Sequence, residues 1–298
     1  MVICTISKNK EEKLSQYNGK IIDFRSRPAL LGEFYGSTPG TKGYETAKWL
    51  NRRVGSKDDE HFTKSFTLDG YIKEVRDSGI TNAVVIGRDT PDLSISNDVI
   101  KDITAPYKEL IGIASVDPQT KGIAQTFEEI HRATETLGLK GINVEPTFGK
   151  PAVYFDDKNF LPVYDLCQSL KIPLFIMSGP TTPNLEHTNP AAIGRIAREF
   201  PNLKIVVCHG CYPYVNEMIG VAFRYENVFV VPDMYIFQAG SKLFVEAANG
   251  FFKDQLLFGT SYPFRPMKQT IEDFIKLGFK DEILDNLFYK NAKRVLNL

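Results

Sequence analysis

The stretch IIDFRSRPAL, residues 21–30, decides between two candidate folds for this chain. Ile21 and Ile22 open a short apolar run typical of a buried strand, and the run ends in Arg25 and Arg27. A doubly wound sheet that binds a dinucleotide places a glycine-rich turn after its first strand. No glycine stands in this stretch, and no GxGxxG motif follows any later predicted strand. The stretch therefore favours a barrel of parallel strands over an open sheet.

Seven more short apolar runs follow, and amphipathic segments with helical spacing separate most of them. The predicted strands are KIIDF (20–24), NAVVIG (82–87), IGIASVDP (111–118), KGINVEP (140–146), IPLFIMSG (172–179), LKIVVCHGC (203–211), NVFVVPD (227–233) and QLLFGTSYP (255–263). Helices are predicted within 67–80, 96–105, 122–138, 160–170, 189–201, 271–278 and 281–296. Eight strands alternating with helices predict a (β/α)8 TIM barrel.

The segment 29–66 is too long for an ordinary strand-to-helix loop and is rich in glycine, serine, threonine and charge. We expect it to be a lid-like insertion after the first strand that folds over the barrel mouth. The chain is then one domain, residues 1–298. A mixed-charge run at 7–14 is expected to be a solvated N-terminal segment.

Composition narrows the function classes. Lysine and arginine number 36, aspartate and glutamate also number 36, and this balance gives no global case for nucleic acid or a membrane surface. Four cysteines are too few for the disulfide framework of a small secreted protein. We see no signal peptide and no membrane span, so a cytoplasmic location is expected. Self-association into a homo-oligomer stays open.

Polar side chains gather at the predicted carboxyl ends of the strands, where TIM barrels hold their active sites. Caps and turns also use such residues, so this signal alone is weak. The side chains at these ends are Arg25, Arg27, Arg88, Asp89, Asp117, Asn143, Glu145, Met177, Ser178, His209, Cys211, Asp233, Tyr235, Ser261 and Tyr262.

The order and spacing of several segments resemble the amidohydrolase superfamily, in its branch of aminocarboxymuconate-semialdehyde decarboxylase-like enzymes. The resemblance covers nearly the whole chain. It rests on SGITNAVVIG, SNDVIKDITAPYKELIGIASVDP, LGLKGINVEP, LPVYDLCQSLKIPLFIMSG, FPNLKIVVCHG, LLFGTSYPF and KNAKRVLNL. It implies a TIM barrel and, in most such families, a divalent metal at the strand ends.

The metal-binding pattern of the family is largely lost here. The family's Asp-x-His-x-His on the first strand reads Asp23-Phe24-Arg25-Ser26-Arg27. Its histidine on the fifth strand is Met177, its aspartate on the eighth is Ser261, and only the histidine on the sixth survives, as His209. A guanidinium group is cationic and has no lone pair to give a metal. The resemblance thus predicts a degenerate site with no metal and no cofactor.

Arg25 and Arg27 have two interpretations. They bind the carboxylate of a small anionic substrate, since a guanidinium fork matches a carboxylate, or they pair internally with Asp23, Glu145 or Asp233. His209 is either a proton-transfer group or a hydrogen-bonded core histidine. A zinc site or a nucleophilic Cys211 in Cys208-His209-Gly210-Cys211 is a weaker alternative, because a second ligand pair and thiolate activation are missing.

The remaining candidate residues complete the expected site. Glu145 and Asp233 are candidate bases beside His209, or else partners of the arginines. Four further residues are expected to contact the substrate: Met177, Tyr235, Ser261 and Tyr262. The other histidines, which are His61, His131 and His187, are expected at the surface.

Three functions fit these residues. The leading hypothesis is a metal-independent hydrolase, amidohydrolase-related and lactonase-like, that acts on a small carboxylated substrate such as a lactone. The alternatives are a decarboxylase of the same family and a non-catalytic protein that binds an anion. Loss of the metal ligands counts against the decarboxylase, because those enzymes use the metal to orient the substrate.

Overall fold

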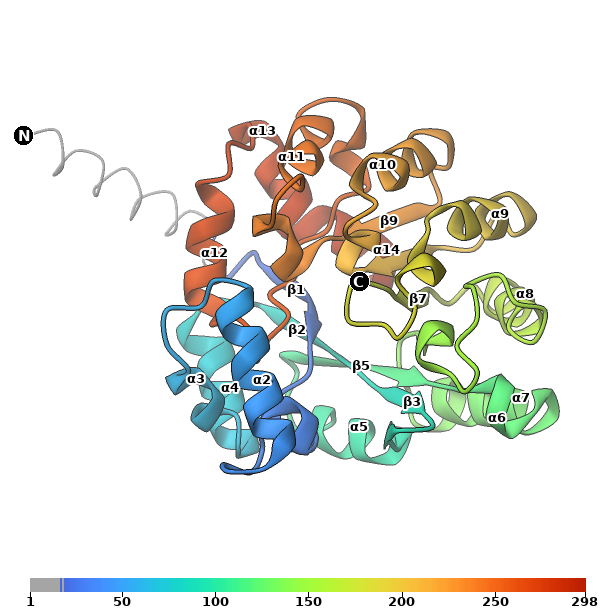
Figure 1. Cartoon of the computed structure of the whole chain (residues 1–298), viewed down its shortest axis with the longest axis horizontal. Helices are drawn as coiled ribbons and strands as arrows, with labels where there is room; N and C mark the ends of the chain where they lie inside the picture. The colour runs from blue at the N-terminus through green and yellow to red at the C-terminus, as the bar shows by residue number, and fades with distance from the viewer. Residues whose placement is uncertain (1–16, 18) are drawn as a thin grey trace, which may run out of the picture.

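The computed structural model describes residue 17 and residues 19–298. Within them, seven parallel strands form one sheet in the order β1-β2-β5-β6-β7-β8-β9. Figure 1 shows these strands at the centre of the molecule with helices around them. The strands are β1 Ile22–Ser26, β2 Asn82–Ile86, β5 Leu110–Ser115, β6 Ile142–Val144, β7 Leu174–Met177, β8 Ile205–Cys208 and β9 Val228–Val231.

The predicted eighth strand closes the barrel without becoming a regular strand. Leu257 N–H donates to Val230 O on β9 at 2.9 Å, and Phe24 N–H on β1 donates to Phe258 O at 3.0 Å. The segment 255–263 therefore bridges the first and last strands of the sheet. The predicted TIM barrel is confirmed.

Helices cover the outside of the barrel, and their apolar faces pack on the strands. α4 begins as predicted, because the Thr67 side chain accepts a hydrogen bond from Gly70 N–H. The sequence analysis missed α10, α11 and a hairpin of β3 and β4. The outer elements are α4 Leu68–Asp77, β3 Arg88–Thr90, β4 Leu93–Ile95, α5 Asn97–Thr104, α6 Pro118–Lys121, α7 Ile123–His131, α8 Leu161–Leu170, α9 Ala191–Glu199, α10 Val215–Arg224, α11 Lys242–Ala248, α12 Met267–Ile275, α13 Asp281–Asp285 and α14 Asn291–Leu296.

The insertion forms α2 (Lys42–Arg53) and α3 (Glu60–Lys64), with short 3-10 turns before them. It is tied to the chain that follows the eighth strand position. Asn51 Nδ2 and Ser56 Oγ both donate to Phe264 O, at 3.1 and 2.8 Å. Figure 1 shows α2 in front of the other helices on its side of the barrel. The insertion is thus a docked wall of the barrel mouth.

Two sequence expectations about histidines are wrong. His61, on α3 of the insertion, is buried where its Nε2 lies 2.7 Å from Pro263 O. His187 is also buried, against the ring of Tyr154. His131 lies on α7, partly exposed, and contacts Glu135 at 2.8 Å.

The remaining expectations concern the cysteines, the N-terminal segment and membrane spans. Cys167, Cys208 and Cys211 are buried free thiols. Cys4 and the mixed-charge run at 7–14 lie outside the described residues. Among the helices that the structure describes, none combines the length and the apolar character that a bilayer crossing needs.

Candidate active site

A β-bulge in β1 turns the arginines into the barrel. Asp23 pairs with Ala83 and Ser26 pairs with Val85, so β1 contains one residue more than β2 over this span. Phe24 belongs to the cluster inside the barrel, and strict alternation would place Arg25 on the outer face. The extra residue resets the alternation, and Arg25 faces inward above Phe24.

A cavity of about 880 Å³ opens at this end of the barrel. Strand ends supply its floor and the insertion supplies one wall. Its apolar surface exceeds its polar surface, which suits a small molecule with a hydrocarbon body. The lining residues are Arg25, Arg27, Phe34, Tyr35, Lys42, Gly43, Thr46, Trp49, Leu50, Arg88, Asp92, Leu93, Phe148, Met177, Pro180, Thr181, His209, Met234 and Phe264.

Arg25 has hydrogen-bond donors without partners. The residue is 2% exposed, and neither its Nε nor its Nη1 has a hydrogen-bond partner among the described residues. Burial and the charge of Arg27 lower the pKa of Arg25, and the carboxylate of Asp233 opposes that shift. A buried guanidinium without partners is costly, so this side chain is ready to receive an anion.

Arg27 is in the opposite situation, because protein atoms occupy its donors. Its Nε donates to Ile86 O at 3.0 Å and its Nη1 donates to Tyr35 Oη at 3.1 Å. Its Nη2 donates to Gly87 O at 2.7 Å and to Glu145 Oε1 at 2.5 Å. Burial lowers the pKa of Arg27, but Glu145 and Tyr35 together outweigh burial, and the pKa is raised. Arg27 therefore has a structural role and holds the strand ends and Glu145 in place.

Glu145 lies between two guanidinium groups. Its Oε1 accepts from Arg27 and, at 3.1 Å, from Asn143 Nδ2, while its Oε2 lies 3.2 Å from Arg88 Nε. Burial raises the pKa of Glu145, but the two arginines outweigh burial and hold that pKa below its usual range. Glu145 is thus a fixed anion and a partner of the arginines, and it is a poor candidate for a base.

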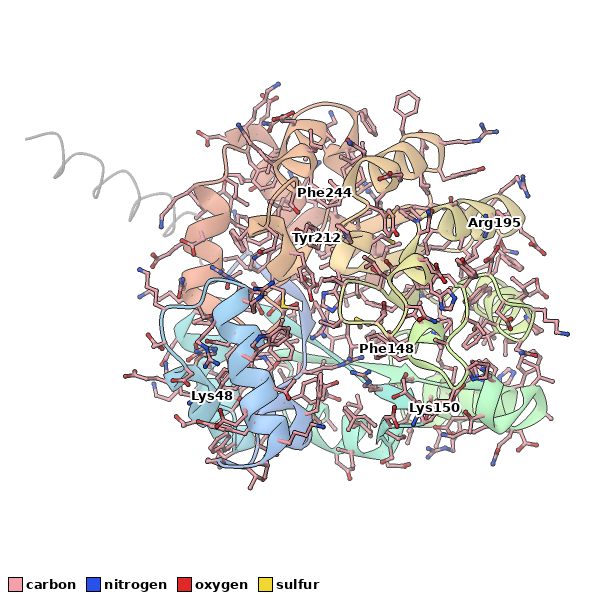
Figure 2. All side chains as sticks on the ribbon, viewed as in Figure 1. Lys48, Phe148, Lys150, Arg195, Tyr212 and Phe244 are labelled. Atoms are coloured by element: carbon pink, nitrogen blue, oxygen red, sulfur yellow. The ribbon has the colours of Figure 1, made fainter. Side chains whose placement is uncertain are left out.

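Arg88 is a cavity residue to which the sequence analysis gave no role. Its guanidinium lies 5.5 Å from the ring centre of Phe34 and 4.6 Å from that of Phe148, which is labelled in Figure 2. It is 8% exposed, and its Nε has no hydrogen bond in addition to the ion pair with Glu145. Cation–π attraction to the two rings favours this position of the guanidinium.

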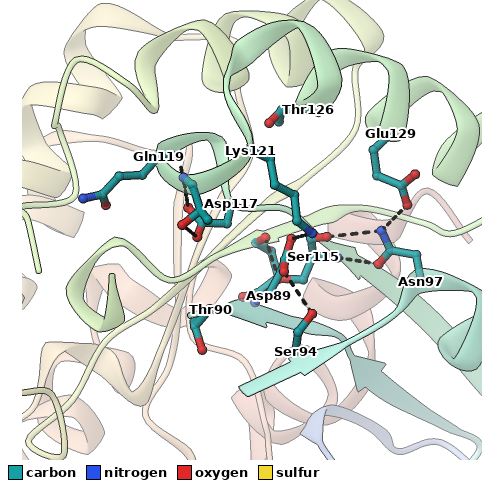
Figure 3. Close-up of polar contacts among 12 residues, drawn as sticks. Asp89, Thr90, Ser94, Asn97, Ser115, Asp117, Gln119, Lys121, Thr126 and Glu129 are labelled. Carbon is teal, nitrogen blue, oxygen red and sulfur yellow. Dashed lines mark hydrogen bonds and ion pairs between the residues drawn. The ribbon is translucent and has the colours of Figure 1, made fainter. Parts of the chain in front are cut away.

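The β3–β4 hairpin that holds Arg88 is anchored from behind. Figure 3 shows Lys121 and Ser94 converging on Asp89, the residue after Arg88. Lys121 Nζ lies 2.6 Å from Asp89 Oδ2, and Ser94 Oγ donates to Asp89 Oδ1 at 3.0 Å. Asn97 joins α5 to β5 through two hydrogen bonds with the Ser115 backbone. These contacts hold the hairpin against the barrel.

His209 and Asp233 form a pair at the ends of β8 and β9. His209 Nδ1 lies 3.0 Å from Asp233 Oδ1 and 2.8 Å from its Oδ2. Burial is the largest influence on His209 and lowers its pKa; Arg25 and Arg27 add to this, and Asp233 opposes it. A neutral imidazole whose Nδ1–H donates to Asp233 leaves Nε2 as an acceptor. His209 also lines the cavity.

Backbone strain gathers at the same strand ends. His209, Cys211, Asp233 and Ser261 have φ values of 65°, 53°, 42° and 58°, in the left-handed region that favours glycine. Each such residue costs on the order of 1 kcal/mol or more, and such strain clusters at functional sites. The strain supports a functional interpretation of this end of the barrel.

Of the other residues predicted to contact the substrate, only some lie at the cavity. Met177 lines the cavity. The Tyr235 ring packs edge-on against His209, with 5.2 Å between ring centres, and so supports the imidazole from the side. Ser261 is buried outside the lining and donates its N–H to Arg25 O at 3.0 Å.

Tyr262 is misplaced by the sequence analysis. Its hydroxyl donates to His61 O at 2.6 Å under the insertion, and its ring packs near Tyr71. It does not line the cavity, because its position on the closing segment directs it outward. We correct it to a structural residue.

The alternative chemistry at Cys208 and Cys211 has no support in the structure. Burial raises the pKa of each thiol to about 12, so neither is a thiolate at neutral pH. Within residue 17 and residues 19–298, no group of three or more histidine, cysteine, aspartate or glutamate side chains is placed to hold a metal ion.

Comparisons with known proteins agree with this architecture. A family model described as Amidohydrolase matches residues 58–298. An uncharacterised TIM-barrel protein from Bordetella bronchiseptica has 30% identity and a TM-score of 0.85, over 93% of this chain and 98% of that one. No curated protein matches the sequence. The chain belongs to the amidohydrolase family.

Two more distant solved structures share the fold. A dihydroxybenzoic acid decarboxylase from Polaromonas with bound manganese has 14% identity and a TM-score of 0.65, over 93% of this chain and 97% of that one. A 4-oxalomesaconate hydratase from Rhodopseudomonas palustris has 17% identity and a TM-score of 0.62, over 93% of this chain and 95% of that one.

The manganese in the decarboxylase raises the question of whether these residues fit a metal. Guanidinium groups at Arg25 and Arg27 carry no lone pair and repel a cation, and the Met177 thioether is a soft ligand that manganese disfavours. The Nδ1 of His209 faces Asp233, which leaves Nε2 as a single nitrogen donor. The residues present do not fit a divalent metal ion.

Proposed function

We propose that this chain is an enzyme that binds a small carboxylated substrate in the arginine-lined cavity and uses His209 to accept a proton. The observation that carries the proposal is the meeting of two unusual groups in one cavity. Arg25 has donors without protein partners, and His209, whose pKa burial lowers, is oriented by Asp233. The first group suits an anion and the second suits a base.

Hydrolysis of a carboxylated lactone or ester fits this arrangement. His209 Nε2 takes a proton from water as the water oxygen bonds to the carbonyl carbon, and the carbonyl oxygen becomes an oxyanion. Nearby guanidinium charge stabilises that oxyanion. The carbon–oxygen bond of the leaving group then breaks, and the imidazolium returns its proton to the leaving oxygen. The Asp233 carboxylate stabilises the imidazolium between these steps.

Decarboxylation is the second candidate, and the comparisons favour it over hydrolysis. Dihydroxybenzoate and carboxyvanillate decarboxylases share this fold. The charges of the site weigh against decarboxylation. A guanidinium stabilises the negative charge of the carboxylate, and that group must become neutral carbon dioxide as the reaction proceeds. The reaction also needs a proton delivered to carbon, whereas a neutral His209 has none on Nε2.

Product analysis separates the candidates. The purified chain would be incubated with a panel of aromatic and cyclic carboxylic acids and carboxylated lactones, with and without added manganese, and the products identified by mass. We expect the gain of one water, without a need for manganese, and loss of turnover in Arg25→Met. Loss of carbon dioxide would assign the decarboxylase. A carboxylate that binds but is never converted would assign the non-catalytic binding protein.

A further inference from the structure

Four cationic side chains line the cavity, and nearby carboxylates offset part of their charge. Arg25, Arg27, Arg88 and Lys42 line the cavity. Glu145, between two of the arginines, offsets one positive charge. Asp233, beside the neutral His209, offsets a second.

Asp92, which also lines the cavity, pairs with Lys150 and does not reduce the positive charge of these four side chains. Asp23, a buried carboxyl with a pKa of about 6 that interacts with the charge of Arg25, offsets a third. One positive charge then remains, and the unused hydrogen-bond donors indicate where a second acidic group binds.

The unused donors are divided between two places. At the end of β1, Arg25 Nε and Nη1 have no hydrogen-bond partner. The donors of Arg27 are already used, in hydrogen bonds to Ile86, Gly87, Tyr35 and Glu145. On the hairpin, only Nε of Arg88 faces a carboxylate, and no hydrogen bond to its Nη1 or Nη2 is found among the described residues. Arg88 also lines a second cavity of about 340 Å³ beside the first.

We infer that Arg88 is a specificity-determining residue that binds a second acidic group, so that the substrate is a dianion whose two acidic groups reach Arg25 and Arg88. The inference rests on the proposed function and names its substrate class. Phe34 and Phe148 flank Arg88, and this apolar wall suits a flat hydrocarbon body between the two acidic groups. The ion pair with Glu145 and the anchored hairpin hold the Arg88 guanidinium in place before the substrate arrives.

Binding of simple acids tests this without knowledge of the reaction. Calorimetry would compare benzoate with the three benzenedicarboxylate isomers, which offer three spacings between the acidic groups. We expect at least one isomer to bind roughly 10- to 100-fold more tightly than benzoate, the range of a hydrogen bond to a charged group. Arg88→Met should abolish that preference and leave benzoate affinity close to wild type. Arg25→Met should weaken every acid.

Lys158→Met is the matched control, since it removes one positive charge from an exposed side chain outside the linings of both cavities. It should preserve the diacid preference. Arg88→Lys should retain part of it, and circular dichroism establishes that each variant is folded. Equal binding of benzoate and all three isomers, or a preference that survives Arg88→Met, would overturn the inference while leaving carboxylate binding at Arg25 intact. Failure of every acid to bind wild type would count against both proposals.

Discussion

Replacing Arg25 or Arg27 by methionine should have opposite effects on stability and binding. The sequence alone treats Arg25 and Arg27 alike, as two guanidinium groups two residues apart. The structure separates them, because Arg27 donates hydrogen bonds to four protein groups and Arg25 leaves Nε and Nη1 without partners. We therefore expect one variant to lose stability and the other to lose its ligand.

The size of the stability effect follows from the contacts. Arg27→Met removes one partner of the buried pair with Glu145, a loss of about 3–5 kcal/mol. For a chain of this length that corresponds to a fall in melting temperature of roughly 5–8 °C. Arg25→Met removes a buried charge whose Nε and Nη1 lack hydrogen-bond partners, so the melting temperature should stay close to that of wild type. It should weaken benzoate binding by about 1.5–3 kcal/mol.

Thermal melts followed by circular dichroism and calorimetric titration with benzoate measure both quantities on the same samples. Each variant is the control for the other, because they differ only in which arginine of the strand is changed. A fall in melting temperature for Arg25→Met as large as that for Arg27→Met, with benzoate affinity unchanged, would refute the division of roles.

Three further outcomes follow from the same contacts. Elemental analysis of the purified chain should find no stoichiometric divalent metal; one equivalent, removed by chelator together with activity, would contradict the donor-set argument. Nuclear magnetic resonance of ¹⁵N-histidine should show His209 neutral at pH 7 with its proton on Nδ1, and Asp233→Asn should lower its pKa further because the carboxylate favours the imidazolium. Burial lowers the pKa of His61 from 6.5 to about 4. Between these two pH values the unfolded chain therefore binds more protons than the folded chain. The free energy of unfolding should fall by up to about 3 kcal/mol as the pH drops through this range. Urea unfolding should therefore show a smaller pH dependence for His61→Gln than for wild type, and an equal dependence would contradict the burial of His61.

Much of the architecture could be predicted from sequence, because apolar runs such as NAVVIG and LKIVVC at regular spacing suffice to identify parallel strands. The carboxyl ends of those strands also located His209, Asp233 and the arginines. The bulge between Asp23 and Ser26 could not be predicted, since it is a property of the pairing of β1 with β2. It decides that both arginines enter the cavity.

Other parts of the site depend on contacts between distant segments. Arg88 was visible at a strand end, but its role requires Phe34 from the insertion and Phe148 from beyond β6. His61 was expected at the surface because it lies on a predicted helix or loop, and its burial follows from docking of the insertion on Pro263. Tyr262 is next to a family metal position, yet the closing segment turns its hydroxyl toward His61 O.

The rate of His209→Asn, compared with wild type on whichever substrate the product analysis identifies, tests the central claim most directly. A positioned general base contributes about 10²–10⁴-fold, so kcat should fall by about that factor while ligand affinity and melting temperature stay close to wild type. His131→Asn, on the outer helix α7, is the matched control and should keep the full rate. A His209→Asn enzyme that turns over at the wild-type rate would contradict the account, because the proton would then pass through another group.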